Sequence, residues 1–166
     1  MADVREQRRG RKIAFTDQER DAFLDQEKVC RLGSINADGS PHVTPIWYAW
    51  DGRAMWFYSI IKSQRWTNVT RDQRVSAVVD AGGAEYFQLR GVEVIGDLHP
   101  VGEQPRVGTF DPELEVPERL FGERYLGGEM TGYDGRHAWL CLRPTKIVSW
   151  DFRKLTGTET ITNPNR

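Results

Sequence analysis

The stretch from residue 34 to residue 68 constrains the fold most strongly. Two Asp-Gly pairs, Asp38-Gly39 and Asp51-Gly52, separate extended runs that are rich in β-branched and aromatic residues. Asp-Gly tolerates the positive φ angles that tight hairpins demand. We therefore predict three strands, over residues 33–35, 41–48 and 55–59, joined as a meander.

A short helix is predicted directly after the third strand. Its start combines two cations and a hydroxyl, Lys62, Ser63 and Arg65. Ser63 can cap the helix, and the free backbone N–H groups, the positive helix end and the two side-chain charges could converge on a phosphate. The residues therefore indicate a site for a phosphorylated cofactor, with an ordinary surface helix start as the alternative that spacing alone leaves open.

The rest of the chain also favours a sheet. Thr16 and Glu19 have the spacing of a capping box, which predicts a helix from this point. Further strands are predicted over residues 75–80, 86–98, 138–142 and 147–151. Gly91 and Gly96 suggest bends or bulges within the long strand. The proline-rich section 99–135, with one helix from 117 through 125, is predicted to lie outside the barrel that these strands form.

Composition limits the function classes. The 166 residues, 39% hydrophobic and 28% charged, suit one globular domain. No apolar run reaches the ~18 residues of a membrane span, and the start lacks a secretory signal, so we expect no membrane association and a cytoplasmic protein. The net charge of −1 makes nucleic acid an improbable partner. Cys30 and Cys141 show no metal-ligand spacing and are expected to be buried thiols.

Several motifs, in order, resemble one known family. They are the strand Gly33–Ile35, the turn Asp38–His42, the strand Pro45–Trp47, and the helix start with Ser63, Arg65 and Asn68. This pattern resembles the split-barrel proteins related to pyridoxamine 5'-phosphate oxidase, particularly the branch that uses an 8-hydroxy-5-deazaflavin coenzyme in place of FMN. The resemblance implies a mainly β, six-stranded, FMN-binding type of split β-barrel with two or three peripheral helices. A basic flexible tail (1–15), one barrel domain (16–155) and a polar tail (156–166) would make up the chain.

The resemblance also implies a cofactor site. Lys62, Ser63 and Arg65 would hold the phosphate, and Ser59 and Ile60 would hold the ring and ribityl chain. Residues of more loosely matched roles are Pro45, Ile46 and Trp47 beneath the ring, Asn68 at the phosphate or as a helix anchor, and Trp139, Trp150 and Arg153 completing the site of a second subunit. Packing in the core is the alternative for Trp47, and a turn or interface position is the alternative for His42.

The function implied is that of a homodimeric oxidoreductase. A deazaflavin or FMN at the dimer interface would transfer hydride to a small unsaturated or oxidised organic acceptor, and no catalytic residue is assigned because the cofactor ring does the chemistry. Oxidation of a vitamin B6 phosphate by FMN is one alternative, although the chain lacks the arginine-rich ending of those enzymes. A non-catalytic protein that binds a cofactor or haem is another, with His42, His99 or His137 as the axial ligand.

Overall fold

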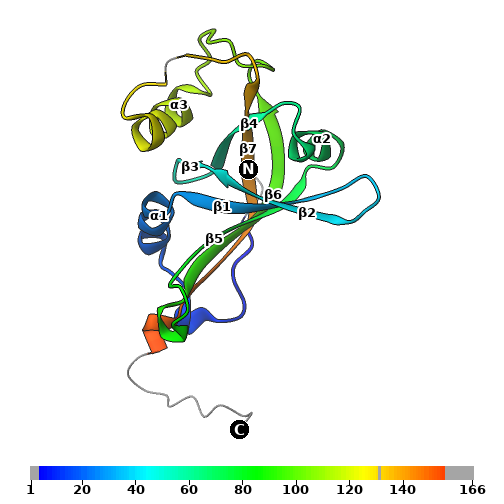
Figure 1. Cartoon of the computed structure of the whole chain (residues 1–166). Coiled ribbons are helices and arrows are strands. Elements are labelled where there is room, and N and C mark those ends of the chain that lie inside the picture. The colour runs from blue at the N-terminus through cyan, green and yellow to red at the C-terminus, as the bar shows by residue number, and fades with distance from the viewer. Residues whose placement is uncertain (1–3, 131, 156–166) are drawn as a thin grey trace.

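A curled antiparallel sheet forms the body of the protein, in a computed structural model that describes residues 4–130 and 132–155 (Figure 1). Its strands follow the spatial order β2-β1-β5-β6-β7-β4-β3. The strands and helices are, in chain order, α1 Asp17–Gln26, β1 Val29–Ile35, β2 Pro41–Trp47, β3 Ala49–Trp50, β4 Met55–Ile60, α2 Gln64–Arg71, β5 Arg74–Ala81, β6 Arg90–Val101, α3 Glu115–Phe121 and β7 His137–Asp151. Short turns of 3-10 helix cover Arg11–Ile13, Tyr86–Gln88 and Phe152–Leu155, and a π-helical turn, η3, covers Gly122–Leu126.

Covalent connectivity shows how far the sheet curls. β2 and β3 stand at opposite ends of the strand order, yet Tyr48 alone separates them in the chain. The two edges of the sheet therefore meet at this corner and diverge beyond it. Within the described residues β2 pairs only with β1, and β4 pairs with β7 and β3, so an open seam remains between β2 and β4.

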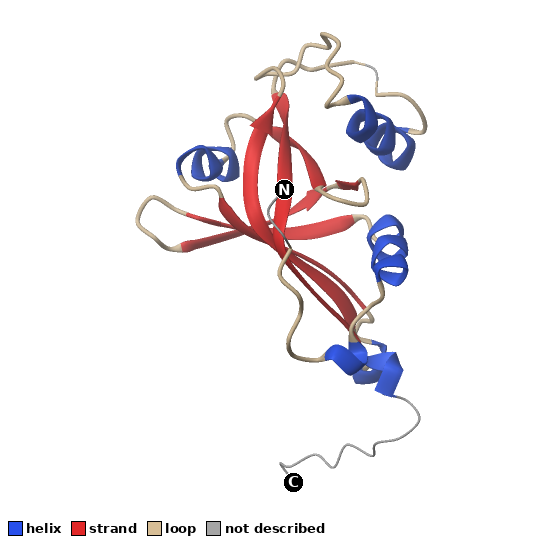
Figure 2. Ribbon diagram, turned by 180° about the vertical axis from the view of Figure 1, so that it is seen from behind, coloured by secondary structure: helices blue, strands red, loops and turns tan. Residues whose placement is uncertain are grey.

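The fold class expected from the sequence is confirmed. Six longer strands and the two-residue β3 make the split barrel, and three helices lie around it, with α1 and α3 on one side and α2 on the other (Figures 1 and 2). The predicted hairpin of the first two strands is confirmed by the pairing of β1 with β2, but the meander is wrong in its third strand, because β4 pairs with β7 and β3 instead of with β2. The fully buried Tyr48 explains the change of direction, since its hydroxyl bonds the Leu24 and Glu27 carbonyls and anchors the chain against the end of α1.

β7 is a single strand of 15 residues where the sequence suggested two separate strands. Pro144 lies inside it opposite Gly96, where the pairing with β6 shifts register. A proline lacks the N–H that a regular ladder needs, so the bulge accommodates it. A Cβ on Gly96 would lie 2.0 Å from the Arg143 carbonyl oxygen, which explains the glycine.

Gly91, where the sequence suggested a bend or bulge, pairs in regular register with both neighbouring strands, and the glycine has a packing cause. A Cβ on Gly91 would lie 2.4 Å from the indole ring of Trp150 on the paired strand β7, so only glycine lets the ring lie across the sheet. The long strand β6 begins at Arg90, later than residue 86, because residues 86–88 form a 3-10 turn. It ends at Val101, so the excursion outside the barrel starts at Gly102.

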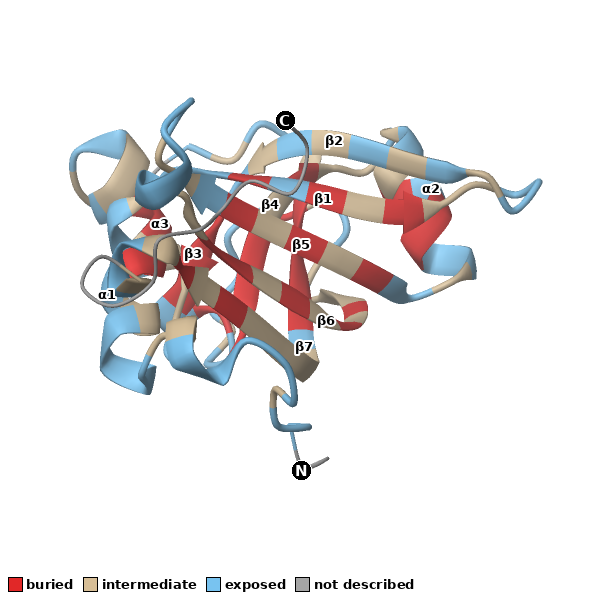
Figure 3. Cartoon of the chain, turned by 90° about the horizontal axis from the view of Figure 1, so that it is seen from below, coloured by how far each residue is buried: buried red, intermediate tan, exposed pale blue. Residues whose placement is uncertain are grey.

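Two apolar clusters stabilise these layers. The larger one fills the barrel and includes Leu32, Phe57, Val79 and Leu140, while α2 closes it with Trp66 and Val69. The buried residues of the second cluster lie between the sheet and α3; they are Ala49, Ala54, Trp56, Leu114, Phe121, Trp139 and Cys141. Figure 3 shows the alternation of buried and more exposed positions along β1 and β5, whereas β2 has no buried residue.

The two cysteines are buried free thiols, as predicted. Burial raises the pKa of the Cys30 thiol to about 12 and that of Cys141 to about 11. Thiolate is the reactive form of cysteine, so both groups are inert at neutral pH.

The described part of the N-terminal segment lies along β7. Arg5 donates its backbone N–H to the Thr145 carbonyl at 3.0 Å. The Gln7 amide both donates to the Ser149 carbonyl and accepts from the Ser149 N–H, at 3.0 and 2.9 Å. The segment 4–15, expected to be part of a flexible tail, therefore makes hydrogen bonds to β7. The polar tail expected over 156–166 lies outside the described residues. In the part of the chain described, no helix has the length and apolar character needed to cross a membrane.

Candidate functional site

Arg65, in the first turn of α2, bridges the open seam of the barrel. Its Nε donates to Ser59 Oγ on β4 at 3.2 Å, and its Nη1 donates to Thr44 Oγ1 on β2 at 2.6 Å. Ser59 is buried, and Thr44 and Arg65 are half-buried. The seam residues are therefore Thr44, Ser59 and Arg65, from three different elements.

The start of α2 adds further groups beside Arg65. Ser63 is the N-cap, and its Oγ accepts from the Trp66 N–H at 3.2 Å. Lys62 lies exposed in the turn between β4 and α2. Backbone N–H groups of a first helical turn that have no internal partner favour an anion. The structure thus joins Ser59 to Arg65 by a hydrogen bond, and Lys62 and Ser63 lie at the same helix start.

The charge of Arg65 has no counter-charge in its surroundings. Both of its partners are hydroxyls, and no carboxylate within the described residues forms an ion pair with it. Burial lowers the pKa of its guanidinium, because the charged form loses more hydration than its surroundings compensate. Arg106, by contrast, is buried with two carboxylates beside it. A half-buried cation that only hydroxyls contact is suited to receive an anionic ligand.

Asn68 serves as a structural anchor for this helix. It is buried, and its Nδ2 donates to Ser34 Oγ at 3.1 Å and to Asn36 Oδ1 at 3.0 Å. Its Oδ1 accepts from Gln64 at 2.9 Å. These bonds attach α2 to β1 and to the turn after it, so they set the orientation of the helix start.

The other residues predicted to contact the cofactor ring lie on both faces of β2 and at the end of β4. Ile46 points inward and packs on the barrel core, whereas Pro45 and Trp47 are exposed on the outer face. Ile60 ends β4 half-buried, opposite His137 of β7. Trp47 stacks on Tyr125 of η3, with ring centroids 4.6 Å apart and planes 2° apart.

Trp139, predicted to complete a neighbouring site, is fully buried in the second cluster. Its indole N–H donates to Glu118 Oε1 at 3.0 Å, and its ring packs edge-on against Phe121. This environment gives Trp139 a packing role and no access to a ligand. Trp150 packs on Gly91, and Arg153 forms an ion pair with Asp151 at 2.6 Å.

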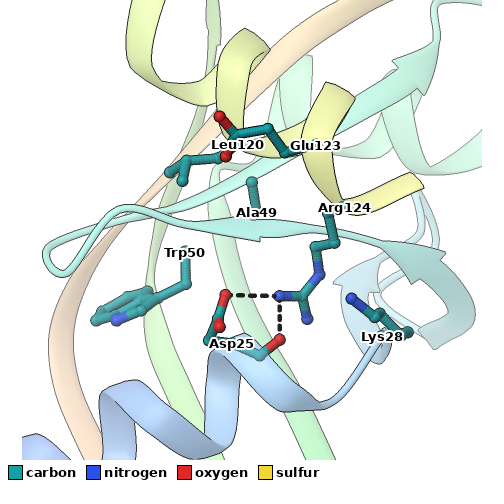
Figure 4. Close-up of a pocket in the computed structure, with 7 residues that line it drawn as sticks. All are labelled: Asp25, Lys28, Ala49, Trp50, Leu120, Glu123 and Arg124. Atoms are coloured by element: carbon teal, nitrogen blue, oxygen red, sulfur yellow. Dashed lines mark hydrogen bonds and ion pairs between the residues drawn. The ribbon is translucent and has the colours of Figure 1, made fainter. Parts of the chain in front are cut away.

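A cleft of about 200 Å³ lies between α1, β3 and α3, on the side of the barrel opposite α2 (Figure 4). Its lining residues are Asp25, Lys28, Ala49, Trp50, Leu120, Glu123 and Arg124. Arg124 bonds carbonyl oxygens at the end of α1, including that of Leu24 at 2.9 Å, and pairs with Asp25 at 3.3 Å. Because Arg124 is already paired with Asp25 and bonded to the end of α1, we interpret this cleft as a helix-to-helix contact.

A metal site and a haem site find less support among the described residues. No group of three or more His, Cys, Asp or Glu side chains is arranged to hold a metal ion there. The three histidines lie on separate strands, and His137 Nδ1 is 2.7 Å from Asp134 Oδ2.

Sequence reasoning missed two residues of the site. Thr44 could have been found from the alternation along β2, which puts it on the same face as His42 and Ile46. Tyr125 could not, because only the folded position of residues 102–136 brings it to Trp47.

Comparison with known proteins agrees with the geometry. A search of curated protein sequences found no match. Among solved structures, the conserved hypothetical protein Rv2991 from Mycobacterium tuberculosis is 29% identical, with a TM-score of 0.74 over 97% of this chain and 99% of that one. An F420 reductase is 25% identical, with a TM-score of 0.55 over 76% and 94% of the two chains. A FAD-binding protein from Mesorhizobium loti, 18% identical with a TM-score of 0.61 over 82% and 94%, shares the fold.

The sequence pattern of one family covers most of the chain. The family described as pyridoxamine 5'-phosphate oxidase matches residues 16–151, which includes every strand, all three helices and the seam residues. The protein therefore belongs to the pyridoxamine 5'-phosphate oxidase family of split barrels.

Proposed function

We propose that the protein is a flavin- or deazaflavin-dependent oxidoreductase that acts on a small unsaturated or oxidised organic acceptor. The observation that carries the proposal is the uncompensated charge of Arg65 beside Ser63 and Lys62. A cofactor phosphate would supply the missing counter-charge. When bound, the cofactor ring would accept and donate hydride.

The residues of this chain would hold and orient that cofactor. Arg65 would bind the phosphate through charge-assisted hydrogen bonds, with Lys62 and the N–H groups of α2 adding to it. Thr44 and Ser59 hold the Arg65 guanidinium in a fixed plane, which reduces the entropy lost on binding. The outer face of β2, with Pro45 and Trp47, would contact the ring. The likeness to an F420 reductase favours F420, an 8-hydroxy-5-deazaflavin, and FMN is the second choice.

A homodimer is part of the proposal. The outer face of β1 and β2 exposes Val29 (40%), Val43 (63%) and Trp47 (50%); Val29 pairs with Trp47, and Val43 lies farther along the same face of β2, beyond Pro45. An adjoining apolar surface of this kind is typical of an interface. A second copy would cover it and bury the cofactor between subunits. Val43→Glu should then give a monomer in analytical ultracentrifugation, while a dimer with unchanged affinity would contradict this interface.

Titration calorimetry of the purified protein tests the cofactor site. We expect FMN or F420 to bind, and Arg65→Gln to weaken that binding roughly 10- to 100-fold, the loss of one charge-assisted bond. Riboflavin, which lacks the phosphate, should bind Arg65→Gln and the wild type alike. The matched control is Arg143→Gln. Arg143 is exposed on β7 and lies six residues, or about 20 Å, along that strand from His137, which pairs with Ile60 at the end of β4.

Two results would contradict the proposal. One is that neither FMN nor F420 binds the wild-type protein. The other is that Arg65→Gln binds them with wild-type affinity. If a cofactor binds, its chemically reduced form, mixed anaerobically with a quinone, tests the hydride transfer itself: absorbance should show the cofactor oxidised as the quinone is reduced to the hydroquinone.

A further inference from the structure

Trp47 and Tyr125 form a flat aromatic pair at the end of β2. Their rings are 4.6 Å apart and within 2° of parallel. Trp47 is nevertheless 50% exposed, so Tyr125 covers one face of the indole and the other face remains accessible. The pair therefore presents a flat, apolar surface on the outside of the barrel.

Hydrogen bonds fix the orientation of Tyr125. Its hydroxyl lies 2.7 Å from the Lys28 carbonyl and 2.8 Å from the Tyr48 carbonyl, and it accepts from the Tyr48 N–H at 3.2 Å and from Arg124 Nε at 3.0 Å. The Phe121 ring packs against Tyr125 at 4.7 Å. Bonded at one end and packed on its face, the Tyr125 ring has little freedom to rotate.

The π-helical turn η3 brings Tyr125 to this place. The turn follows α3 directly, and such turns are often found at functional sites. Arg124, the neighbouring residue, bonds the carbonyls of Leu24 and Glu27 and so attaches the turn to α1. The position of the Trp47 indole thus depends on a segment outside the barrel.

A fixed and half-exposed indole is what recognition of a planar ring requires. Holding an exposed aromatic side chain costs conformational entropy, and a preorganised ring repays that cost when a ligand stacks on it. Trp47 lies three residues from Thr44, or about 10 Å along the strand. Because β2 is an edge strand, a ligand anchored at Arg65 can pass over its free edge to the face that carries Trp47.

We propose that Tyr125 is a positioning residue for ring recognition, which holds the Trp47 indole so that a planar, delocalised ring stacks on its open face. The inference rests on the proposed function. It adds that α3 and η3 position the residue on which the ring stacks, whereas Arg65 binds the phosphate. The ring belongs either to the cofactor or to an aromatic acceptor, and the two sources share this stacking chemistry.

Calorimetric titrations with riboflavin, FMN and menadione, a planar quinone, separate these sources. Tyr125→Leu removes the stack, and Tyr125→Phe keeps the stack but removes the hydroxyl bonds. We expect Tyr125→Leu to raise the dissociation constant about fivefold to tenfold, and Tyr125→Phe to raise it less. If Tyr125→Leu weakens the binding of riboflavin and FMN equally, the surface is assigned to the cofactor ring. If it weakens the binding of menadione alone, the surface is assigned to the acceptor.

Trp47→Leu shows whether Tyr125 acts through the indole. In the Trp47→Leu background, a further Tyr125→Leu change should have no added effect, because the residue being positioned is already absent. The matched control is Tyr86→Leu, which removes an exposed tyrosine that packs edge-on against Phe152 in the turn before β6. Thermal melting and sedimentation should show each variant folded and in the wild-type oligomeric state.

The outcomes separate this inference from the function on which it rests. The inference is overturned if Tyr125→Leu binds all three probes with wild-type affinity. It is also overturned if Tyr125→Leu weakens binding as much in the Trp47→Leu background as it does in the wild type. If Arg65→Gln at the same time weakens FMN binding, the proposed function stands without it. Failure of the wild type to bind FMN and F420 contradicts the function instead, and the menadione titration then decides the inference alone.

Discussion

The buried guanidinium of Arg106 donates two hydrogen bonds to the carboxylate of Glu118, at 2.7 and 3.2 Å. Arg106 is only 2% exposed, and Glu118 also accepts from Trp139 at 3.0 Å and from Tyr133 at 3.1 Å. This network attaches the loop after β6 to α3 and to the sheet beneath. It also neutralises the buried charge of Arg106, whereas Arg65 contacts two hydroxyls.

Glu118→Gln should strongly destabilise the protein. The change leaves the buried charge of Arg106 with Glu103 as its only carboxylate partner, so we expect a loss of about 3 kcal/mol in the free energy of unfolding. Urea denaturation measures it. Glu113→Gln, which breaks the exposed pair with Arg143, is the control and should cost no more than ~0.5 kcal/mol. Equal effects of the two changes would show that the network adds nothing beyond a surface pair.

Glu103 should make stability depend on acid pH. A hydrogen bond from the Thr109 hydroxyl, with bonds from Arg106 and backbone N–H groups, lowers the pKa of Glu103 from 4.5 to about 2. A lowered folded-state pKa means that the stabilisation is complete above pH 4.5 and is lost as pH falls through about 2. The stability difference between the wild type and Glu103→Gln should therefore shrink over this range. A constant difference would contradict the assignment.

Asn68→Ala should affect both stability and the anion site. The buried Ser34 hydroxyl would lose its partner, at a cost of about 2 kcal/mol. The start of α2 would also lose its attachment to β1, so FMN affinity should fall although Asn68 itself binds no ligand in our proposal. Thr70→Ala, on the exposed side of the same helix, is the control for both denaturation and titration. Loss of stability with full affinity would mean that the anchor does not orient the site.

Thr16→Ala tests the capping box of α1. Thr16 Oγ1 accepts from the Glu19 N–H at 3.2 Å, and Glu19 Oε2 accepts from the Thr16 N–H at 2.7 Å. We expect a loss of about 1 kcal/mol in the free energy of unfolding, because the helix start is left with unsatisfied donors. Gln18→Ala, at an exposed position of the same turn, should change it little. Thermal denaturation of the two variants side by side measures the difference.

Local signals in the sequence predicted local structure well. The capping box at Thr16, the N-cap at Ser63 and the bend at Gly96 depend on neighbouring residues, and all three are confirmed. Lys62, Ser63 and Arg65 are grouped because a single helix start carries them. The motif order, likewise, was sufficient to identify the family.

What the sequence did not predict depends on long-range packing. The single strand β7 continues through Pro144 because β6 pairs with it on both sides of the bulge at Gly96. The burial of Trp139 depends on Glu118, which is 21 residues away in the chain. Neither the Thr44 contact of Arg65 nor the Tyr125 stack has a local sequence pattern, since each joins elements that meet only in the folded barrel.

The stems of the excursion from 102 to 136 are held side by side. Val101 pairs with Trp139, the Arg106 N–H bonds the His137 carbonyl at 2.8 Å, and the Ile61 N–H bonds the Arg136 carbonyl at 3.0 Å. Its two ends are therefore fixed to each other and to the sheet, while Leu114 and Phe121 between them cover the strand residues of the second cluster. Variation in the length or sequence of this segment would thus reshape the surface beside Trp47 from anchored ends, at a distance along the chain from Arg65 and the start of α2.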